Sequence, residues 1–213
     1  MVDPKCIDSA EKLIRLWVHE NKRVFEDRFI NEIDHAWFIE LMQANVKEYF
    51  NMNWDIVVPE PRLIFGDFMI AGADVRFYDE ISNLTELKTS IETYLVEHND
   101  NSKQPMPLVM FMDAIEHVCR VARVLRQPQG NALLLGVGGS GRQSMTRLAT
   151  YISGYRLFQV EIAKGYGMNE WREDIKTCLL YAGVEDKPVT FLFSDAQVRG
   201  LVTSGVTLYR AYS

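Results

Sequence analysis

Gly136-Val137-Gly138-Gly139-Ser140-Gly141-Arg142-Gln143-Ser144 is the stretch that decides the fold. It follows the apolar run Ala132-Leu133-Leu134-Leu135 and precedes a helix-like segment from Met145 to Ile152. Four glycines in six residues free the backbone from Cβ clashes, so that successive N–H groups can form an anion-binding concavity at the start of a helix. The sequence therefore predicts a phosphate-binding loop between a strand and a helix, with all nine residues as nucleotide contacts.

The loop departs from the usual phosphate-loop motif at the two positions after its last glycine. Arg142 stands where the motif has lysine, and its planar fork can grip phosphate oxygens without taking the place of a lysine ammonium. Gln143 stands where the motif has the Ser or Thr hydroxyl that binds Mg²⁺, and it offers an amide oxygen on a longer side chain. Ser144 has a hydroxyl, but it lies one residue after the motif position. Both are candidate Mg²⁺ ligands. The loop therefore favours binding of ATP or ADP over hydrolysis. The alternative is a glycine-rich turn that binds no ligand.

A second apolar run, Val189-Thr190-Phe191-Leu192-Phe193-Ser194-Asp195, ends in an acid and is typical of a buried parallel strand. In phosphate-loop ATPases such a strand ends in an Asp that holds Mg²⁺, often beside an acid that orients water. Asp195 is thus a candidate for either role. If it binds the metal, Ala196 stands in the catalytic position; counted one residue earlier, Ser194 takes the metal position and Asp195 the catalytic one. The third reading is an acid that only caps the following segment.

Composition excludes several function classes. The 213 residues are 47% hydrophobic, and no apolar run approaches the ~20 residues of a membrane helix. The N-terminus lacks a basic start with an apolar core, and three scattered cysteines suit a reducing compartment. The net charge of −6 comes without a basic patch for nucleic acid. Arg120, Arg123 and Arg126 recur on one helix face, which predicts a solvated face or a contact between modules.

The rest of the chain predicts a helical unit followed by alternating helices and strands. Apolar residues recur at helical intervals from about Ser9 to Phe50, with a second helix from about Trp37 to Tyr49. Pro59 and Pro61 mark a boundary between the two parts. Beyond it the patterns predict helices at 84–98, 108–125 and 169–181 and strands at 157–162 and 189–195. The fold class is therefore α/β, with a partial parallel sheet, flanking helices and a small helical subdomain in front.

Gly130 to Ser144 resembles the fourth AAA module of an axonemal dynein heavy chain. The similarity extends through Asp113-Ala114-Ile115-Glu116-His117, Arg123 to Pro128 and Phe191 to Asp195. Leu16-Trp17-Val18-His19-Glu20 resembles the helical lid of the third module. The resemblance implies an AAA-type phosphate-loop NTPase fold with three parts, which are a lid-like subdomain at 1–56, an incomplete large subdomain at 57–197 and a divergent tail at 198–213. Without further strands for its sheet, the chain is expected to be only marginally stable.

The resemblance also implies a function. Such chains form a ring of six AAA modules that moves along microtubules in cilia and flagella, with the main hydrolytic site in the first module and a regulatory fourth module. We therefore expect a nucleotide-binding regulatory fragment with weak or no hydrolysis, located in the cytoplasm and the axonemal cytoskeleton. Its implied partners are the remaining AAA modules, dynein intermediate and light chains, and microtubules. The alternatives are a structural fragment whose loop holds no nucleotide, and an active ATPase that uses Arg142 and Asp195.

Overall fold

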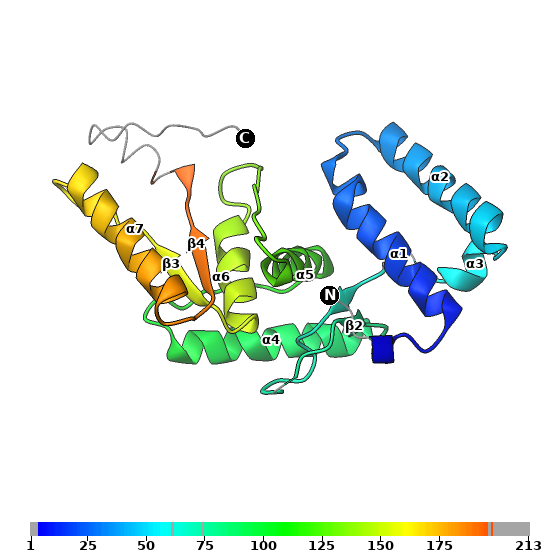
Figure 1. The fold of residues 1–213 in the computed structure, drawn as a ribbon, viewed down its shortest axis with the longest axis horizontal. Helices are drawn as coiled ribbons and strands as arrows, with labels where there is room; N and C mark the ends of the chain where they lie inside the picture. The colour runs from blue at the N-terminus through cyan, green and yellow to red at the C-terminus, as the bar shows by residue number, and fades with distance from the viewer. Residues whose placement is uncertain (1–3, 61, 74, 196, 198–213) are drawn as a thin grey trace.

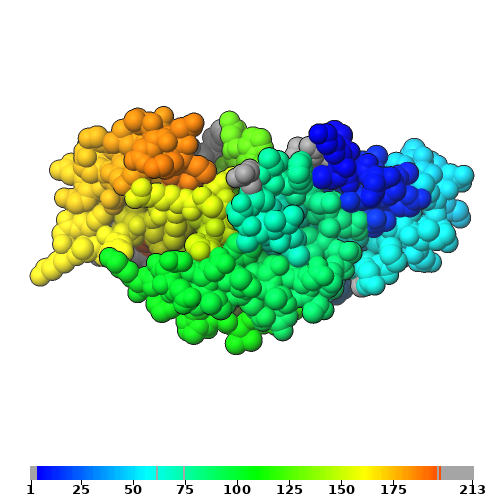
Figure 2. All heavy atoms as spheres, turned by 90° about the horizontal axis from the view of Figure 1, so that it is seen from below, coloured from blue at the N-terminus to red at the C-terminus, as the bar shows by residue number. Residues whose placement is uncertain are grey.

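The computed structural model describes residues 4–60, 62–73, 75–195 and 197. Figure 1 shows a helical lid at one end, a helical body in the middle and a strand–helix–strand unit at the other end, and Figure 2 shows the same three parts as neighbouring coloured regions of the surface. The helices are α1 (Ala10–Val24), α2 (Glu32–Phe50), α3 (Trp54–Val57), α4 (Leu84–Asn101), α5 (Met112–Arg126), α6 (Arg142–Ile152) and α7 (Met168–Gly183). The strands are β1 (Phe65–Gly66), β2 (Asp79–Glu80), β3 (Arg156–Gln159) and β4 (Val189–Leu192), and 3₁₀ turns lie at η1 (Pro4–Cys6) and η2 (Glu26–Arg28).

The lid is formed by α1, α2 and α3. The Ser9 side chain caps α1 by accepting from the Lys12 N–H, and the apolar faces of the helices meet in one core. That core consists of Ile14, Val18, Phe38, Met42, Val46 and Val57. The expected helices are confirmed, although α2 begins five residues before Trp37, because Asn31 caps it by accepting from the Asp34 N–H.

The body is built from α4, α5 and α6, which pack through fully buried aliphatic side chains. Leu87 and Ile91 of α4, Ile115 and Val118 of α5 and Leu148 of α6 are all 0% exposed. Figure 1 shows α6 standing on α4 with the glycine-rich loop at its far end. Because the last two turns of α6 are buried, its first turn is held in a fixed direction at the surface.

The third unit confirms the predicted parallel pairing. β3 and β4 are parallel, with Arg156 opposite Val189, and α7 lies between them in sequence. Trp171 of α7 packs against the rings of Phe191 and Phe193. A separate antiparallel pair, β1 with β2, lies beside the lid. The predicted fold class, α/β with a partial parallel sheet and flanking helices, is thus confirmed.

The predicted strand at Ala132–Leu135 is wrong. A strand needs a hydrogen-bonded neighbour, and in the described part of the chain β3 and β4 pair only with each other. Leu133 and Leu135 are accordingly 77% and 80% exposed. The other two predicted strands are shorter than expected, since pairing stops at Gln159 and Leu192. The described helices include no segment with the length and apolarity needed to cross a bilayer.

Directional polar contacts join the lid to the body. Arg15 of α1 makes a two-point ion pair with Glu80, with Nε–Oε1 and Nη2–Oε2 distances of 2.7 and 2.9 Å. Glu20 of α1 pairs with both Nε and Nη2 of Arg123 on α5. The neighbouring His19 is 5% exposed, and its Nδ1 lies 2.9 Å from the Leu63 carbonyl oxygen. Burial, followed by the charge of Arg23, lowers the pKa of His19 to about 4, so His19 is neutral at neutral pH.

Leu148→Ala tests the packing of the body. The substitution removes a side chain with no exposure, so we expect the free energy of unfolding to fall by about 2–5 kcal/mol. Leu179→Ala is the control, because Leu179 lies on α7 with 65% exposure, and its effect should stay below about 0.5 kcal/mol. Urea unfolding followed by circular dichroism measures both values. Equal losses for the two variants would contradict the described core.

Arg123→Ala tests the contact between lid and body. The change leaves the Glu20 carboxylate, whose side chain is 25% exposed, without its cation, and we expect a loss of about 1–3 kcal/mol. Arg120→Ala is the comparison on the same helix, because Arg120 also reaches the lid, through Asp27, but its ion-pair distances are 3.5 and 3.7 Å and its side chain is 36% exposed. It should cost less than about 1 kcal/mol in the same urea titration. A larger loss for the Arg120 variant than for the Arg123 variant would show that the Glu20–Arg123 pair is not the main polar contact between lid and body.

Candidate functional site

The glycine-rich loop leads directly into the N-terminus of α6. Gly139 and Gly141 have φ values of +81° and +77°, a region that favours glycine, and a Cβ added at Gly138 or Gly139 would meet no atom within 4 Å. Gly141 is the N-cap of α6, no side chain caps this end, and the first turn contains no acid. The N–H groups and positive dipole end of α6 therefore face an open, glycine-lined surface, which is the arrangement that binds phosphate.

Arg142 folds back onto the loop. Its Nη1 donates to the Leu134 carbonyl oxygen at 3.3 Å, and its Nη2 donates to the Val137 carbonyl oxygen at 3.0 Å. The guanidinium rests against Gly136, where an added Cβ would lie 3.2 Å from Nη1. Within the described residues, no carboxylate forms an ion pair with Arg142. The guanidinium of Arg142 is thus hydrogen-bonded to backbone carbonyl oxygens of the segment before α6.

The structure does not bring the predicted metal and catalytic residues together. Gln143 is exposed, Ser144 is half-buried, and Asp195 is exposed just beyond β4. No hydrogen bond or ion pair in the described part of the chain joins Asp195 to the loop. The same described residues include no group of three His, Cys, Asp or Glu side chains that suits a metal. Amide, hydroxyl and carboxylate oxygens are suitable Mg²⁺ ligands, but in this arrangement they are not gathered around one point. The geometry of the loop therefore suits phosphate binding better than the geometry of these three residues suits Mg²⁺ binding.

Gln197 is a residue of this region that the sequence analysis missed. It is 6% exposed, and its Oε1 accepts from the Ser194 N–H at 2.7 Å and from the Ser194 hydroxyl at 3.1 Å. Its Nε2 donates to the Val160 carbonyl oxygen. Gln197 thereby ties the segment after β4 to the segment after β3, and it engages the Ser194 hydroxyl, the metal candidate in one alignment. A glutamine beyond a strand end carries no local sign of such burial.

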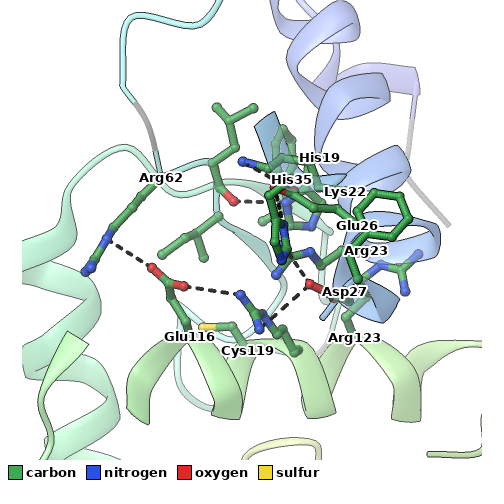
Figure 3. Close-up of a pocket in the computed structure, with 15 residues that line it drawn as sticks. His19, Lys22, Arg23, Glu26, Asp27, His35, Arg62, Glu116, Cys119 and Arg123 are labelled. Carbon is green, nitrogen blue, oxygen red and sulfur yellow. Dashed lines mark hydrogen bonds and ion pairs between the residues drawn. The ribbon is translucent and has the colours of Figure 1, made fainter. Parts of the chain in front are cut away.

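A polar cavity of about 310 Å³ lies elsewhere, between α1, η2, residues 62–65 and α5 (Figure 3). Alternating charges cross it in a chain that runs from the lid to the body, with partners 3.1–3.7 Å apart, in the order Arg23, Asp27, Arg120, Glu116 and Arg62. Burial raises the pKa of the Cys119 thiol in its wall to about 12, so this thiol is a poor nucleophile. The residues that line the cavity come from the lid, from residues 62–65 and from α5, and they include neither Asp195 nor a residue of the glycine-rich loop. The cavity therefore belongs to the joint, by which we mean the contact between lid and body. Two members of the arginine row of α5, Arg120 and Arg123, therefore contact the lid, whereas Arg126 pairs with Asp67.

Two family models match the chain. Residues 106–204 match the P-loop containing dynein motor region D4, and residues 2–60 match an AAA+ lid domain. The first match contains the loop, α6 and β4, whereas the second contains α1, α2 and α3. The charged cavity lies where residues of the lid meet those of α5.

Similar full-length proteins agree with these models. The chain is 48% identical over 199 residues to dynein axonemal heavy chain 1 of Mus musculus, which covers 93% of the chain and 5% of that protein. It is 42% identical over 205 residues to dynein axonemal heavy chain 3 of Homo sapiens, with 91% and 5% covered. The chain thus spans about 5% of the length of these relatives. The resemblance inferred from the sequence is confirmed, and the chain belongs to the axonemal dynein heavy chain family.

Proposed function

We propose that this chain is a nucleotide-binding regulatory segment of an axonemal dynein heavy chain. The observation that carries the proposal is the open glycine-rich loop at the uncapped N-terminus of α6, held in place by the buried core of the body. The nucleotide is ATP or ADP, and its contacts are the nine residues from Gly136 to Ser144. The loop's single charged side chain, Arg142, supplies the cation for the phosphates.

Turnover is weak or absent in this proposal. Hydrolysis needs Mg²⁺ and an oriented water beside the phosphates, and Mg²⁺ would supply charge neutralisation there. Gln143, Ser144 and Asp195 are the residues that would hold the ion. Gln143 and Asp195 are exposed, and no described bond links Asp195 to the loop. Asp195 thus remains a candidate catalytic residue only in an arrangement that brings it closer to the phosphates.

The proposed setting follows from the names of the relatives, which are axonemal dyneins. We assign the chain to the axonemal cytoskeleton of cilia or flagella, as part of a microtubule-based motor. Its partners are the remaining AAA modules of the heavy chain, and through the full-length motor the intermediate and light chains and microtubules. Within it, residues 1–56 act as the lid of the third module and residues 57–197 as part of the large subdomain of the fourth. The predicted divergent tail, 198–213, lies outside the described residues.

Nucleotide binding is tested by isothermal titration and by thermal unfolding with ADP or ATP. A ligand that binds the folded chain raises its stability by mass action, by about 2.7 kcal/mol at one hundred times Kd. Gly139→Ala and Gly165→Ala form a matched pair, since their φ values are +81° and +88° and an added Cβ meets no atom within 4 Å at either site. Both substitutions should strain the backbone equally, but only Gly139→Ala should reduce the stabilisation by nucleotide. A folded wild-type chain that gives no heat and no shift at millimolar nucleotide would favour the structural-fragment alternative.

Turnover is tested by steady-state phosphate release with ATP and Mg²⁺. We expect a rate below roughly 1 per second, under the usual range of enzymes, because the acid is not positioned at the loop. Asp195→Asn should lower whatever rate remains, whereas Asp186→Asn, at an exposed acid in the turn before β4, should not. A rate that Asp195→Asn leaves unchanged removes Asp195 from the mechanism. A fast rate that this variant abolishes would instead establish the active ATPase.

A further inference from the structure

The stretch from Ala132 to Ser140 has few restraints other than Arg142. Within the described chain its backbone makes one internal hydrogen bond, from the Ser140 N–H to the Val137 carbonyl oxygen at 3.4 Å. The two hydrogen bonds from Arg142 to Leu134 and Val137 are its other hydrogen bonds to the described residues. Leu133, Leu135 and Val137 are 77–83% exposed, so side-chain packing adds little. Arg142 is therefore the main tie between this stretch and α6.

The same guanidinium is the group that nucleotide binding needs. An arginine grips phosphate through paired N–H donors, and here both Nη atoms donate to carbonyl oxygens of the loop. Its contact with the loop is close, since a Cβ at Gly136 would lie 3.2 Å from Nη1 and 3.4 Å from Cζ. The glycine thus makes room for the folded-back side chain. A carbonyl oxygen and a phosphate oxygen compete for the same donors.

We propose that Arg142 is a latch on the loop, whose guanidinium leaves the carbonyl oxygens of Leu134 and Val137 when it engages a phosphate. The inference rests on the proposed nucleotide binding and assigns a regulation to the same site. Exchange of a half-exposed side chain is fast compared with nucleotide association, so the latch acts by lowering the fraction of the protein that is competent to bind. Removing the latch therefore raises the association rate constant, while removing the phosphate grip raises the dissociation rate constant.

Stopped-flow fluorescence with N-methylanthraniloyl-ADP and the 213-residue chain separates these two effects. Arg142→Ala removes the latch and the grip, so both rate constants should rise, and association should accelerate roughly tenfold, which is the effect of about one net hydrogen bond to a charged group. Gly136→Ala should also accelerate association, because a Cβ 3.2 Å from Nη1 and the strain of alanine at φ +157° both disturb the folded-back arrangement while the charge of Arg142 stays in place. Arg172→Ala is the control for net charge. Arg172 is exposed on α7 and makes no hydrogen bond or ion pair with the described residues.

The outcomes separate the latch from the binding itself. Association of the Arg142→Ala variant that is no faster than that of the Arg172→Ala control overturns the latch and leaves nucleotide binding intact. If Arg142→Ala releases nucleotide too fast to follow, the Gly136→Ala rate decides, and an unchanged rate overturns the latch. If only the Arg142→Ala variant binds, the latch is supported in its strongest form. If no variant binds while circular dichroism shows that all are folded, the proposed function fails and the latch fails with it.

Discussion

The packing of α6 into the body is the constraint on which the candidate site depends. Leu148, Ala149 and Ile152 are at most 1% exposed, and they fix the axis of the helix against α4 and α5. A second tie acts at the far end, where Arg76 donates to the Ile152 carbonyl oxygen at 2.6 Å. A helix held in this way presents its positive end in one direction. The position of the candidate anion site is thus a consequence of apolar packing several residues away.

The lid is attached to the body by polar contacts, whereas the body itself is held together by apolar packing. The body is held by apolar burial, which is strong and non-directional, whereas the joint with the lid relies on paired ions and on the buried, neutral His19. Ion pairs that are partly buried recover much of their desolvation cost only when the geometry is good, so they fix orientation more than they add stability. The two-point pair of Arg15 with Glu80 is of this kind. The angle between lid and body is therefore set by a few directional contacts.

Local patterns in the sequence were sufficient for the helices, the loop and the parallel pair. The spacing of the glycines identifies the phosphate loop because the features that matter lie within nine residues. Tertiary contacts have no such signature, as the Glu20–Arg123 pair shows with its partners 103 positions apart in the sequence. The same holds for Gln197, whose burial depends on Val160. The run Ala132–Leu135 was predicted as a strand from its apolarity, but apolarity does not say whether a neighbouring strand is there to pair with it.

That unpaired run also explains why an arginine suits the end of this loop. A strand paired on both sides would hold the start of the loop by its own ladder, and the cation would be free for phosphate alone. Here the carbonyl oxygens of Leu134 and Val137 take the guanidinium instead. An arginine has five N–H donors, so it can satisfy backbone acceptors and still carry its charge at the helix end, which a lysine with three donors does less well. The residue that departs from the common motif thus serves the backbone of the loop, and in the proposed binding it leaves these acceptors to engage a phosphate.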